Sequence, residues 1–216
     1  MLKEEKIQKQ LKLFSKEDII RKFGMTYKQS DKIDQFINII NEHNNHTNIV
    51  GKSTLNNPWF SHVLDSIQIS NFISNKHSSI LDMGTGAGIP GLFLAINNFT
   101  NVSLVDANLK KIEFIKSACL KLDIKVTIYH QRIESLINKK FDFLVARALA
   151  NLNKLFFYSQ KLSHNKTVLI FLKGKRAEDE IQEACKWWKF KHELYQSISD
   201  KRGNIIIIRE LNKINE

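Results

Sequence analysis

A glycine-rich segment at residues 82–91, which reads DMGTGAGIPG, has the residue types and spacing to bind a ligand. It follows a short apolar run and precedes an apolar stretch with helical spacing, so we expect a turn between a strand and a helix. Glycine lets such a turn bend sharply and lets a ligand approach the backbone closely. In an open α/β sheet this turn lies at the carboxyl ends of the strands, where ligands bind. The contacts expected from the turn are Asp82, Gly84, Gly86 and Gly88.

Two classes of cofactor fit this turn. Residues 86–91 satisfy the G-x-G-x-x-G spacing of dinucleotide-binding proteins. Asp106 ends the next predicted strand, and its carboxylate can accept two hydrogen bonds from a ribose diol of either cofactor. Asp82 favours S-adenosylmethionine (SAM), because a carboxylate repels a pyrophosphate and attracts a sulfonium or an ammonium. SAM is therefore the preferred cofactor, while a nicotinamide dinucleotide and a purely structural turn remain alternatives.

Two more side chains are expected at the same edge of the sheet. Glu134 follows the third predicted strand, where an adenine would lie, although a solvated glutamate also fits that position. Arg147 ends the fourth predicted strand and faces the reactive end of the cofactor. It would position either the cofactor or the base that receives the methyl group, and the alternative is a surface arginine in an ion pair.

A basic loop follows the fifth predicted strand, and its lysines and arginine suit contacts with RNA phosphates. These residues are Lys173, Lys175 and Arg176, and a solvated loop at a helix entry is the alternative. His62 is a further candidate contact with RNA, although a packing or capping role fits it equally well. His43, His46 and His62 have no cysteine or carboxylate at ligand spacing, so no metal is expected.

The residues present and absent narrow the reaction. An exocyclic-amine methylase would show Pro-Pro and an aromatic residue after the fourth strand, and the only prolines are Pro58 and Pro90. Cys119 and Cys185 lie in helical patterns, so neither is expected to be the nucleophile that cytosine methylation at C5 requires. Guanine N7 needs neither a covalent intermediate nor a strong base, only in-line placement and electrostatic help. Arg147 is the expected group for that placement.

Composition agrees with a globular protein that binds a polyanion. The chain has 216 residues, 43% hydrophobic residues and a formal net charge of +11. This charge points to nucleic acid, although the excess of lysine, isoleucine and asparagine is also typical of an AT-rich genome. The start carries acids and no apolar core, and no apolar run approaches the roughly 18 residues that a membrane span needs. We therefore expect a cytoplasmic, monomeric protein that has no membrane partner.

The elements that must position these residues form two parts. Residues 1–75 show helical spacing and are predicted to be a helical extension packed on the main domain, which spans residues 76–216. Alternating strands and helices in the second part predict a doubly wound, mostly parallel α/β sheet that ends in an antiparallel hairpin. Strands are expected at 80–83, 102–106, 126–129, 141–145, 167–172, 193–198 and 204–209, and helices at 89–96, 109–122, 149–162 and 177–189.

With these residues in view, the chain resembles the bacterial 16S rRNA guanine-N7 methyltransferase family, historically called glucose-inhibited division protein B. The resemblance extends from about residue 44 to about residue 181. Its markers are Thr47-Asn48-Ile49-Val50, Trp59 with His62 and Asp65-Ser66, the segment 82–91, Leu104-Val105-Asp106 with Lys110-Lys111, Arg132-Ile133-Glu134, Ala146-Arg147-Ala148 and residues 172–176. Two positions depart from the family pattern. Ala146 stands where serine is frequent, and Ile89 replaces a larger apolar residue.

The resemblance implies a Rossmann-like, SAM-dependent methyltransferase fold with a seven-stranded sheet. It implies methyl transfer from SAM to N7 of a guanine, position 527, in the 530 loop of 16S rRNA. The substrate would be the rRNA within the small ribosomal subunit or an assembly intermediate. A non-catalytic RNA-binding protein with this fold and a nicotinamide-dependent oxidoreductase are the alternatives. Cofactor contacts implied position by position are Gly84, Ile89, Ile133, Glu134 and Arg147.

Overall fold

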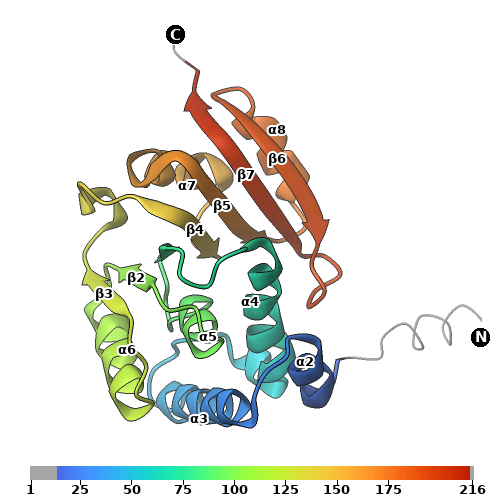
Figure 1. Cartoon of the computed structure of the whole chain (residues 1–216), viewed down its shortest axis with the longest axis vertical. Coiled ribbons are helices and arrows are strands. Elements are labelled where there is room, and N and C mark those ends of the chain that lie inside the picture. Colours follow the sequence, from blue (N-terminus) through green and yellow to red (C-terminus); the bar gives the residue numbers. More distant parts are fainter. Residues whose placement is uncertain (1–13, 215–216) are drawn as a thin grey trace, which may run out of the picture.

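The computed structural model describes residues 14–214, and a single seven-stranded sheet organises them (Figure 1). The strand order is β3-β2-β1-β4-β5-β7-β6. Strands β1 to β5 are parallel, whereas β7 is antiparallel to both β5 and β6. The strands are β1 (Ile80–Met83), β2 (Val102–Asp106), β3 (Thr127–His130), β4 (Phe141–Arg147), β5 (Ser163–Lys173), β6 (Trp188–Gln196) and β7 (Asn204–Lys213). The predicted doubly wound α/β fold with a closing antiparallel hairpin is confirmed.

Side chains of the central strands alternate between two buried cores, as a sheet covered on both faces requires. In β4, Phe143 and Val145 belong to one core, and Leu144 and Ala146 belong to the other. The second core also contains side chains of α7 (Leu152–Leu162) and α8 (Ala177–Ala184). The first core contains side chains of α5 (Gly91–Ile96) and α6 (Leu109–Lys121).

The N-terminal helices pack into the first core and so belong to the same folded unit. They are α2 (Lys16–Lys22), α3 (Tyr27–Asn44), the short helical segments η1 (Lys52–Asn56) and η2 (Trp59–Leu64), α4 (Asp65–Ile67) and η3 (Gln68–Phe72). Phe36 of α3 meets Phe93 of α5 edge to face, with ring centroids 5.3 Å apart. Figure 1 shows α3 at the bottom of the molecule and the C-terminal end of β7 at the top. The extension therefore covers the sheet, while its proposed boundary at residue 75 stays a prediction.

Two local predictions were wrong. The sequence offers Asp31 as a plausible N-cap, but the N-cap of α3 is Thr26, five residues earlier, because Thr26 and Gln29 form a reciprocal capping box. The last helix was expected to reach Lys189, but α8 ends at Ala184 and Trp188 begins β6. Packing explains the second difference, since Trp188 is buried against Phe156 at a ring distance of 5.7 Å.

None of the helices in residues 14–214 is both long and apolar enough to cross a membrane.

Candidate active site

The glycine-rich segment turns sharply at the carboxyl end of β1. Gly84, Gly86 and Gly88 have φ angles of +64°, +61° and +87°. Such angles are strained for residues with a Cβ, so the sequence spacing meets a backbone requirement here. A Cβ on Gly86 would meet nothing closer than the Gly84 carbonyl oxygen at 4.0 Å, whereas a Cβ on Gly84 would lie 2.3 Å from a methyl of Leu149. The turn therefore offers open backbone at Gly86, and Leu149 packs on Gly84.

Asp82 stabilises the glycine turn through two hydrogen bonds. Its Oδ2 accepts hydrogen bonds from the hydroxyl of Thr85 at 2.6 Å and from the backbone N–H of Gly91 at 2.8 Å. The residue is fully buried, and its Oδ1 has no hydrogen-bond partner among the described residues. Burial raises the pKa of Asp82 to about 6, while the bonds from Thr85 and Gly91 oppose the shift. A contact between Asp82 and a cofactor stays a prediction, and the structure adds a role in supporting the turn.

Asp106, at the end of β2, is tied to the same turn. Its Oδ2 accepts a hydrogen bond from the backbone N–H of Gly86 at 3.0 Å, and its Oδ1 accepts one from Asn108 at 2.9 Å. Lys111 lies 3.8 Å from the carboxylate. Each carboxylate oxygen has two lone pairs, so these contacts leave acceptor capacity for a diol. The register of β1 and β2, with Met83 opposite Val105, brings this acid beside the turn.

The remaining residues of the predicted cofactor site lie around this edge. Gly88 and Ile89 are buried, and their backbone N–H groups both donate to the Thr85 carbonyl at 2.9 and 3.0 Å. The short helical turn η4 (Ile133–Ser135) follows β3, with Ile133 buried and Glu134 exposed. Ile133 and Glu134 follow the strand next to Asp106, because β3 pairs with β2.

Arg147 lies at the last position of β4, on the face that Phe143 and Val145 share with the N-terminal helices. Its guanidinium forms an ion pair with Asp65 of α4, with Nη1 and Oδ2 2.9 Å apart. It also donates to the Ser61 carbonyl at 3.3 Å and to Nδ1 of His62 at 2.9 Å. Burial raises the pKa of Asp65, and the Arg147 charge opposes that shift. Arg147 thus forms an ion pair, as one of the two interpretations expected. Its contact with a cofactor or a base stays a prediction.

His62 is buried beside Arg147. It is 2% exposed, and its ring bonds Arg147 on one side and the Thr54 hydroxyl at 2.8 Å on the other. Burial and the Arg147 charge lower the pKa of His62 to about 4. The structure therefore gives His62 a packing role as a neutral histidine, which was the alternative interpretation, and its contact with RNA stays a prediction.

The basic loop divides into an internal and an external part. Lys173 Nζ pairs with Glu180 of α8 at 2.6 Å and donates to the Ala150 carbonyl at 2.8 Å. Only 10% of its side chain is exposed, and it braces β5 against the two helices, while its contact with RNA stays a prediction. Lys175 and Arg176 are exposed and line a hollow of about 230 Å³ at the carboxyl edge. These two residues remain candidates for phosphate contacts.

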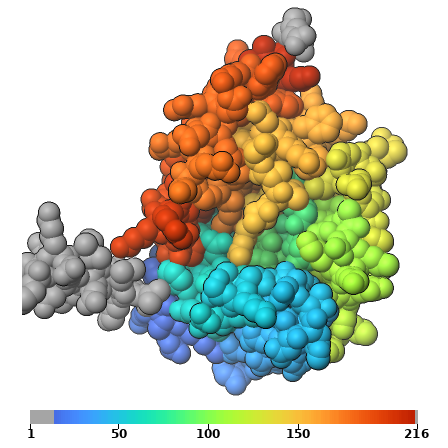
Figure 2. All heavy atoms as spheres, turned by 180° about the vertical axis from the view of Figure 1, so that it is seen from behind, coloured from blue at the N-terminus to red at the C-terminus, as the bar shows by residue number. Residues whose placement is uncertain are grey.

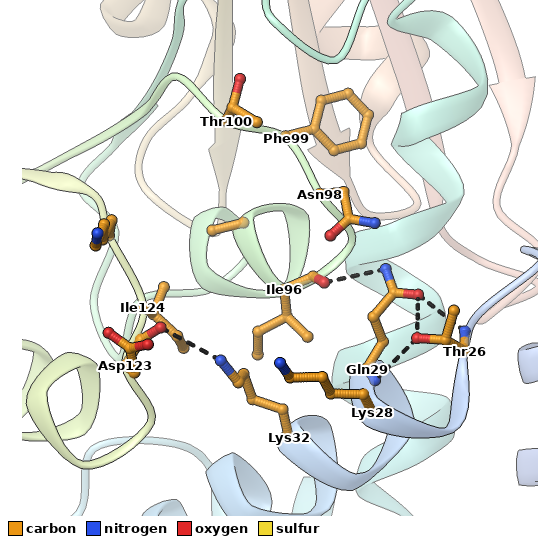
Figure 3. A pocket seen from close by; sticks show the side chains of 12 residues that line it. Thr26, Lys28, Gln29, Lys32, Ile96, Asn98, Phe99, Thr100, Asp123 and Ile124 are labelled. Carbon is orange, nitrogen blue, oxygen red and sulfur yellow. Dashed lines mark hydrogen bonds between the residues drawn. The ribbon is translucent and has the colours of Figure 1, made fainter.

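A separate hollow of about 500 Å³ lies at the opposite edge of the sheet (Figure 3). Its walls are the start of α3, the segment before β2 and the segment before β3, and so the amino ends of the strands. Lys32 donates to the Asp123 carbonyl there at 3.3 Å, and Gln29 bonds the Ile96 carbonyl at 3.1 Å. This hollow is remote from the glycine turn and holds none of the predicted site residues.

Within residues 14–214 no group of three or more histidine, cysteine or carboxylate side chains is arranged to hold a metal ion.

Sequence reasoning missed several polar partners of the site. Thr85 lies inside the glycine turn and donates its hydroxyl hydrogen to Asp82. Its position three residues after Asp82 was the sequence signal for this contact. Asp65 appeared only as a marker of the family resemblance. Ser199 bonds Asp65 at 2.5 Å across 134 residues of sequence, and no local pattern could have revealed that contact.

The fold is that of the Rossmann-like methyltransferases. A ribosomal protein L11 methylase from Lactobacillus delbrueckii subsp. bulgaricus superposes with a TM-score of 0.56 at 17% identity, over 67% of this chain and 75% of that one. TYW2 from M. jannaschii, solved in complex with AdoMet, superposes with a TM-score of 0.53 at 12% identity, over 70% and 77% of the two chains.

Sequence comparison identifies the family. Residues 29–211 match the GidB family, rRNA small subunit methyltransferase G, so the chain belongs to that family. A relative named ribosomal RNA small subunit methyltransferase G, from Rickettsia prowazekii, is 39% identical over 85% of this chain and 95% of its own length. One of the same name from Orientia tsutsugamushi is 35% identical over 87% and 93%. The resemblance inferred from the motifs is confirmed.

Proposed function

We propose that this protein transfers the methyl group of SAM to N7 of a guanine in the 530 loop of 16S rRNA, at position 527. The observation that carries the proposal is the match to the rRNA small subunit methyltransferase G family over residues 29–211, which includes every candidate site residue. Family membership also argues against the oxidoreductase alternative, although residues 86–91 fit the dinucleotide spacing.

The residues at the carboxyl edge fit SAM. The backbone at Gly86 is open, so a ligand can approach it closely. Asp106 retains acceptor capacity for a ribose diol, and Asp82 at the end of β1 carries a buried oxygen that has no hydrogen-bond partner within residues 14–214. When bound, SAM supplies a methyl group on a positively charged sulfur, and carboxylates stabilise that charge. We assign its binding to Asp82, Gly84, Gly86, Gly88, Ile89, Asp106, Ile133, Glu134 and Arg147.

The proposed chemistry asks little of the protein beyond placement. Guanine N7 has a free lone pair at neutral pH, so no general base is needed to activate it. The chain has to hold the base in line with the methyl group and exclude competing orientations. Arg147 is the proposed catalytic residue, because it ends β4 beside the turn and its side chain is 20% exposed.

The RNA partner is proposed from charge and position. Lys175 and Arg176 present exposed positive charge at the same edge as the glycine turn, and the whole chain carries a net charge of +11. Phosphate contacts of this kind orient an RNA without reading its sequence. The proposed partner is 16S rRNA within the small subunit or an assembly intermediate, met by a monomer in the cytoplasm.

The test is methyl transfer from labelled SAM to small subunits that lack the modification, followed by nucleoside mass spectrometry. The expected product is 7-methylguanosine, and Gly84→Arg should abolish it by filling the turn. Gly24→Arg is a matched control, because Gly24 also has a positive φ of +58° and open space around it. SAM binding without transfer would overturn the proposed RNA substrate. RNA binding without any SAM binding would favour the non-catalytic alternative.

A further inference from the structure

Seven polar side chains surround the end of β4 and join three segments that are distant in sequence. We call them the Arg147 cluster: Thr54, His62, Asp65, Gln68, Arg147, Ser197 and Ser199. They come from the N-terminal helices, from β4 and from the connection between β6 and β7. Figure 2 shows that connection, in red, lying against the cyan N-terminal segment. The cluster therefore links the extension and the hairpin to the edge that holds the candidate active site.

The two oxygens of Asp65 have different tasks in this cluster. Oδ2 pairs with Arg147 at 2.9 Å. Oδ1 accepts hydrogen bonds from the Ser199 hydroxyl at 2.5 Å and from the Gln68 amide at 3.2 Å. Ser199 and Gln68 are buried and also bond each other at 3.1 Å. The carboxylate is therefore held on one side by a buried network and holds the guanidinium on the other.

His62 fixes the guanidinium from a second direction. Arginine can only donate, so Nδ1 of His62 must accept and Nε2 must carry the ring proton. Nε2–H then donates to the Thr54 hydroxyl, which in turn donates to the Gly51 carbonyl at 2.6 Å. Because the pKa of His62 is lowered to about 4, the ring is neutral at pH 7 and keeps this accepting role.

The guanidinium of Arg147 is held but keeps free donors. Nη1 contacts Asp65 and the Ser61 carbonyl, and Nη2 donates to His62, whereas Nε has no partner among the described residues. Arg147 is two residues after Val145 in β4, and Val145 pairs with Asp82 of β1 in the sheet register. The free donors thus belong to a side chain fixed close to the glycine turn, which is the arrangement expected of a pre-oriented contact rather than of a fold brace alone.

We propose that Asp65 is the positioning residue of Arg147: by pairing with the guanidinium from α4, it holds the remaining N–H donors in the orientation that methyl transfer requires. The N-terminal extension then contributes to the reaction as well as to the core, and Ser199 of the hairpin steadies Asp65. This inference rests on the proposed function of the site.

The first experiment follows the guanidinium itself and needs neither SAM nor RNA. The chain has six arginines, so the Nε–Hε signals in an NMR spectrum are few. Asp65→Asn should increase the fast motion of the Arg147 Nε–H and speed its exchange with water. Asp123→Asn, which changes an exposed carboxylate at the opposite edge, should leave that signal unchanged. An equally rigid Arg147 in the Asp65→Asn protein would overturn the proposal.

The second experiment is a double-mutant cycle on the single-turnover rate of methyl transfer. Asp65→Asn should lower the rate about 10- to 100-fold, the usual cost of displacing a placed group by about 1 Å. In an Arg147→Ala background the same change should have almost no further effect, because a positioning residue acts through its partner. A full additive loss in that background would indicate a general structural role and overturn the proposal.

Two controls keep the outcomes separate. Ser199→Ala removes one brace and leaves the ion pair, so it should give a smaller loss in the same direction even if Asp65→Asn folds poorly. If the wild-type protein neither binds SAM nor methylates RNA, the proposed function fails, and the NMR result still decides whether Asp65 holds Arg147. If wild type is active and Asp65→Asn keeps full activity, only the positioning proposal fails.

Discussion

At the scale of single residues, two basic side chains in similar positions differ in role because their partners differ. Arg147 and Lys173 both end strands at the carboxyl edge, and both are basic. Arg147 is held by Asp65 and retains free donors, whereas Lys173 is paired with Glu180 and is 10% exposed. Exposure and partners therefore favour a structural role for Lys173 and a role in the reaction for Arg147.

Replacement of Asp106 tests the cofactor site. Asp106→Ala should weaken SAM binding by about 2–4 kcal/mol, because two hydrogen bonds to a charged acceptor are lost and do not add fully. It also removes the bond from the Gly86 N–H, so the turn loosens as well. Isothermal titration with SAM measures the change, and Asp179→Ala on the exposed face of α8 is the control. Unchanged affinity would remove Asp106 from the site.

Two separate buried groups, Asp82 and His62, make opposite contributions to the pH dependence of stability. The pKa of Asp82 is raised to about 6 on folding, so its contribution is present in acid and is lost as the pH rises through 6. The pKa of His62 is lowered to about 4, so its contribution is present at neutral pH and is lost as the pH falls through 4. Between these values the two effects offset each other.

Asp82→Asn should expose the contribution of His62. The unfolding free energy of the variant relative to wild type should fall by about 2–3 kcal/mol from pH 7 to pH 4, because about two pKa units are removed from one side of the balance. Urea unfolding at several pH values measures this difference, in which the other titrating groups cancel. A difference that does not change with pH would contradict the raised pKa of Asp82.

At the scale of elements, Glu180 joins β5, α7 and α8. Its carboxylate pairs with Lys173 of β5 and accepts a hydrogen bond at 2.8 Å from the backbone N–H of Leu152, the first residue of α7. Asn151 caps the same helix through Lys154. The start of α7 is therefore held from β5 and from α8. It lies next to the loop that contains Leu149, the residue that packs on Gly84.

Lys173→Ala should destabilise the protein rather than abolish RNA contact. The change leaves Glu180 partly buried without its cation, so a loss of about 2–4 kcal/mol in unfolding free energy is expected. Thermal and urea unfolding measure the loss. Lys175→Ala is the matched control, because that lysine is exposed in the same loop and should change stability by less than about 0.5 kcal/mol. Equal stability of the two variants would contradict the brace.

At the scale of the whole molecule, positive charge is the main long-range feature available to an RNA. The net charge is +11, and exposed cations of the loop after β5 lie at the edge that carries the glycine turn. The hairpin connection adds exposed Lys201 and Arg202 on the same edge, since Asn204 pairs with Lys173 in the sheet. Binding to RNA should therefore weaken steeply as salt rises.

The double change Lys175→Ala and Arg176→Ala should lower RNA affinity and make the salt dependence shallower. Loss of two phosphate contacts should reduce the slope of log K against log salt by about 1.4–1.8. Binding titrations with 16S rRNA fragments over a range of salt measure the slope. The doubly substituted protein should bind SAM as wild type does, and an unchanged slope would place the RNA on another surface.

The order of strands and helices could be predicted because it depends on local patterns. Apolar runs flanked by turns indicated all seven strands, and the glycine spacing indicated the ligand-binding turn, whose backbone angles only glycine adopts without strain. The end of α8 could not be predicted, since Trp188 is buried by contact with Phe156 from a different element. Thr26 was missed as the cap of α3, although the capping box is a local signal.

The sequence by itself determined the fold class, the family and the location of the turn and acids at the strand ends. Only the tertiary structure decided which charged residues are internal. Arg147 meets Asp65 across 82 residues of sequence, and Lys173 meets Glu180 because alternation in β5 turns it toward α8. Burial changes what a charge can do, since a desolvated group must be paired or neutral. Pairing and burial depend on distant segments meeting in space, and one-dimensional spacing does not contain that information.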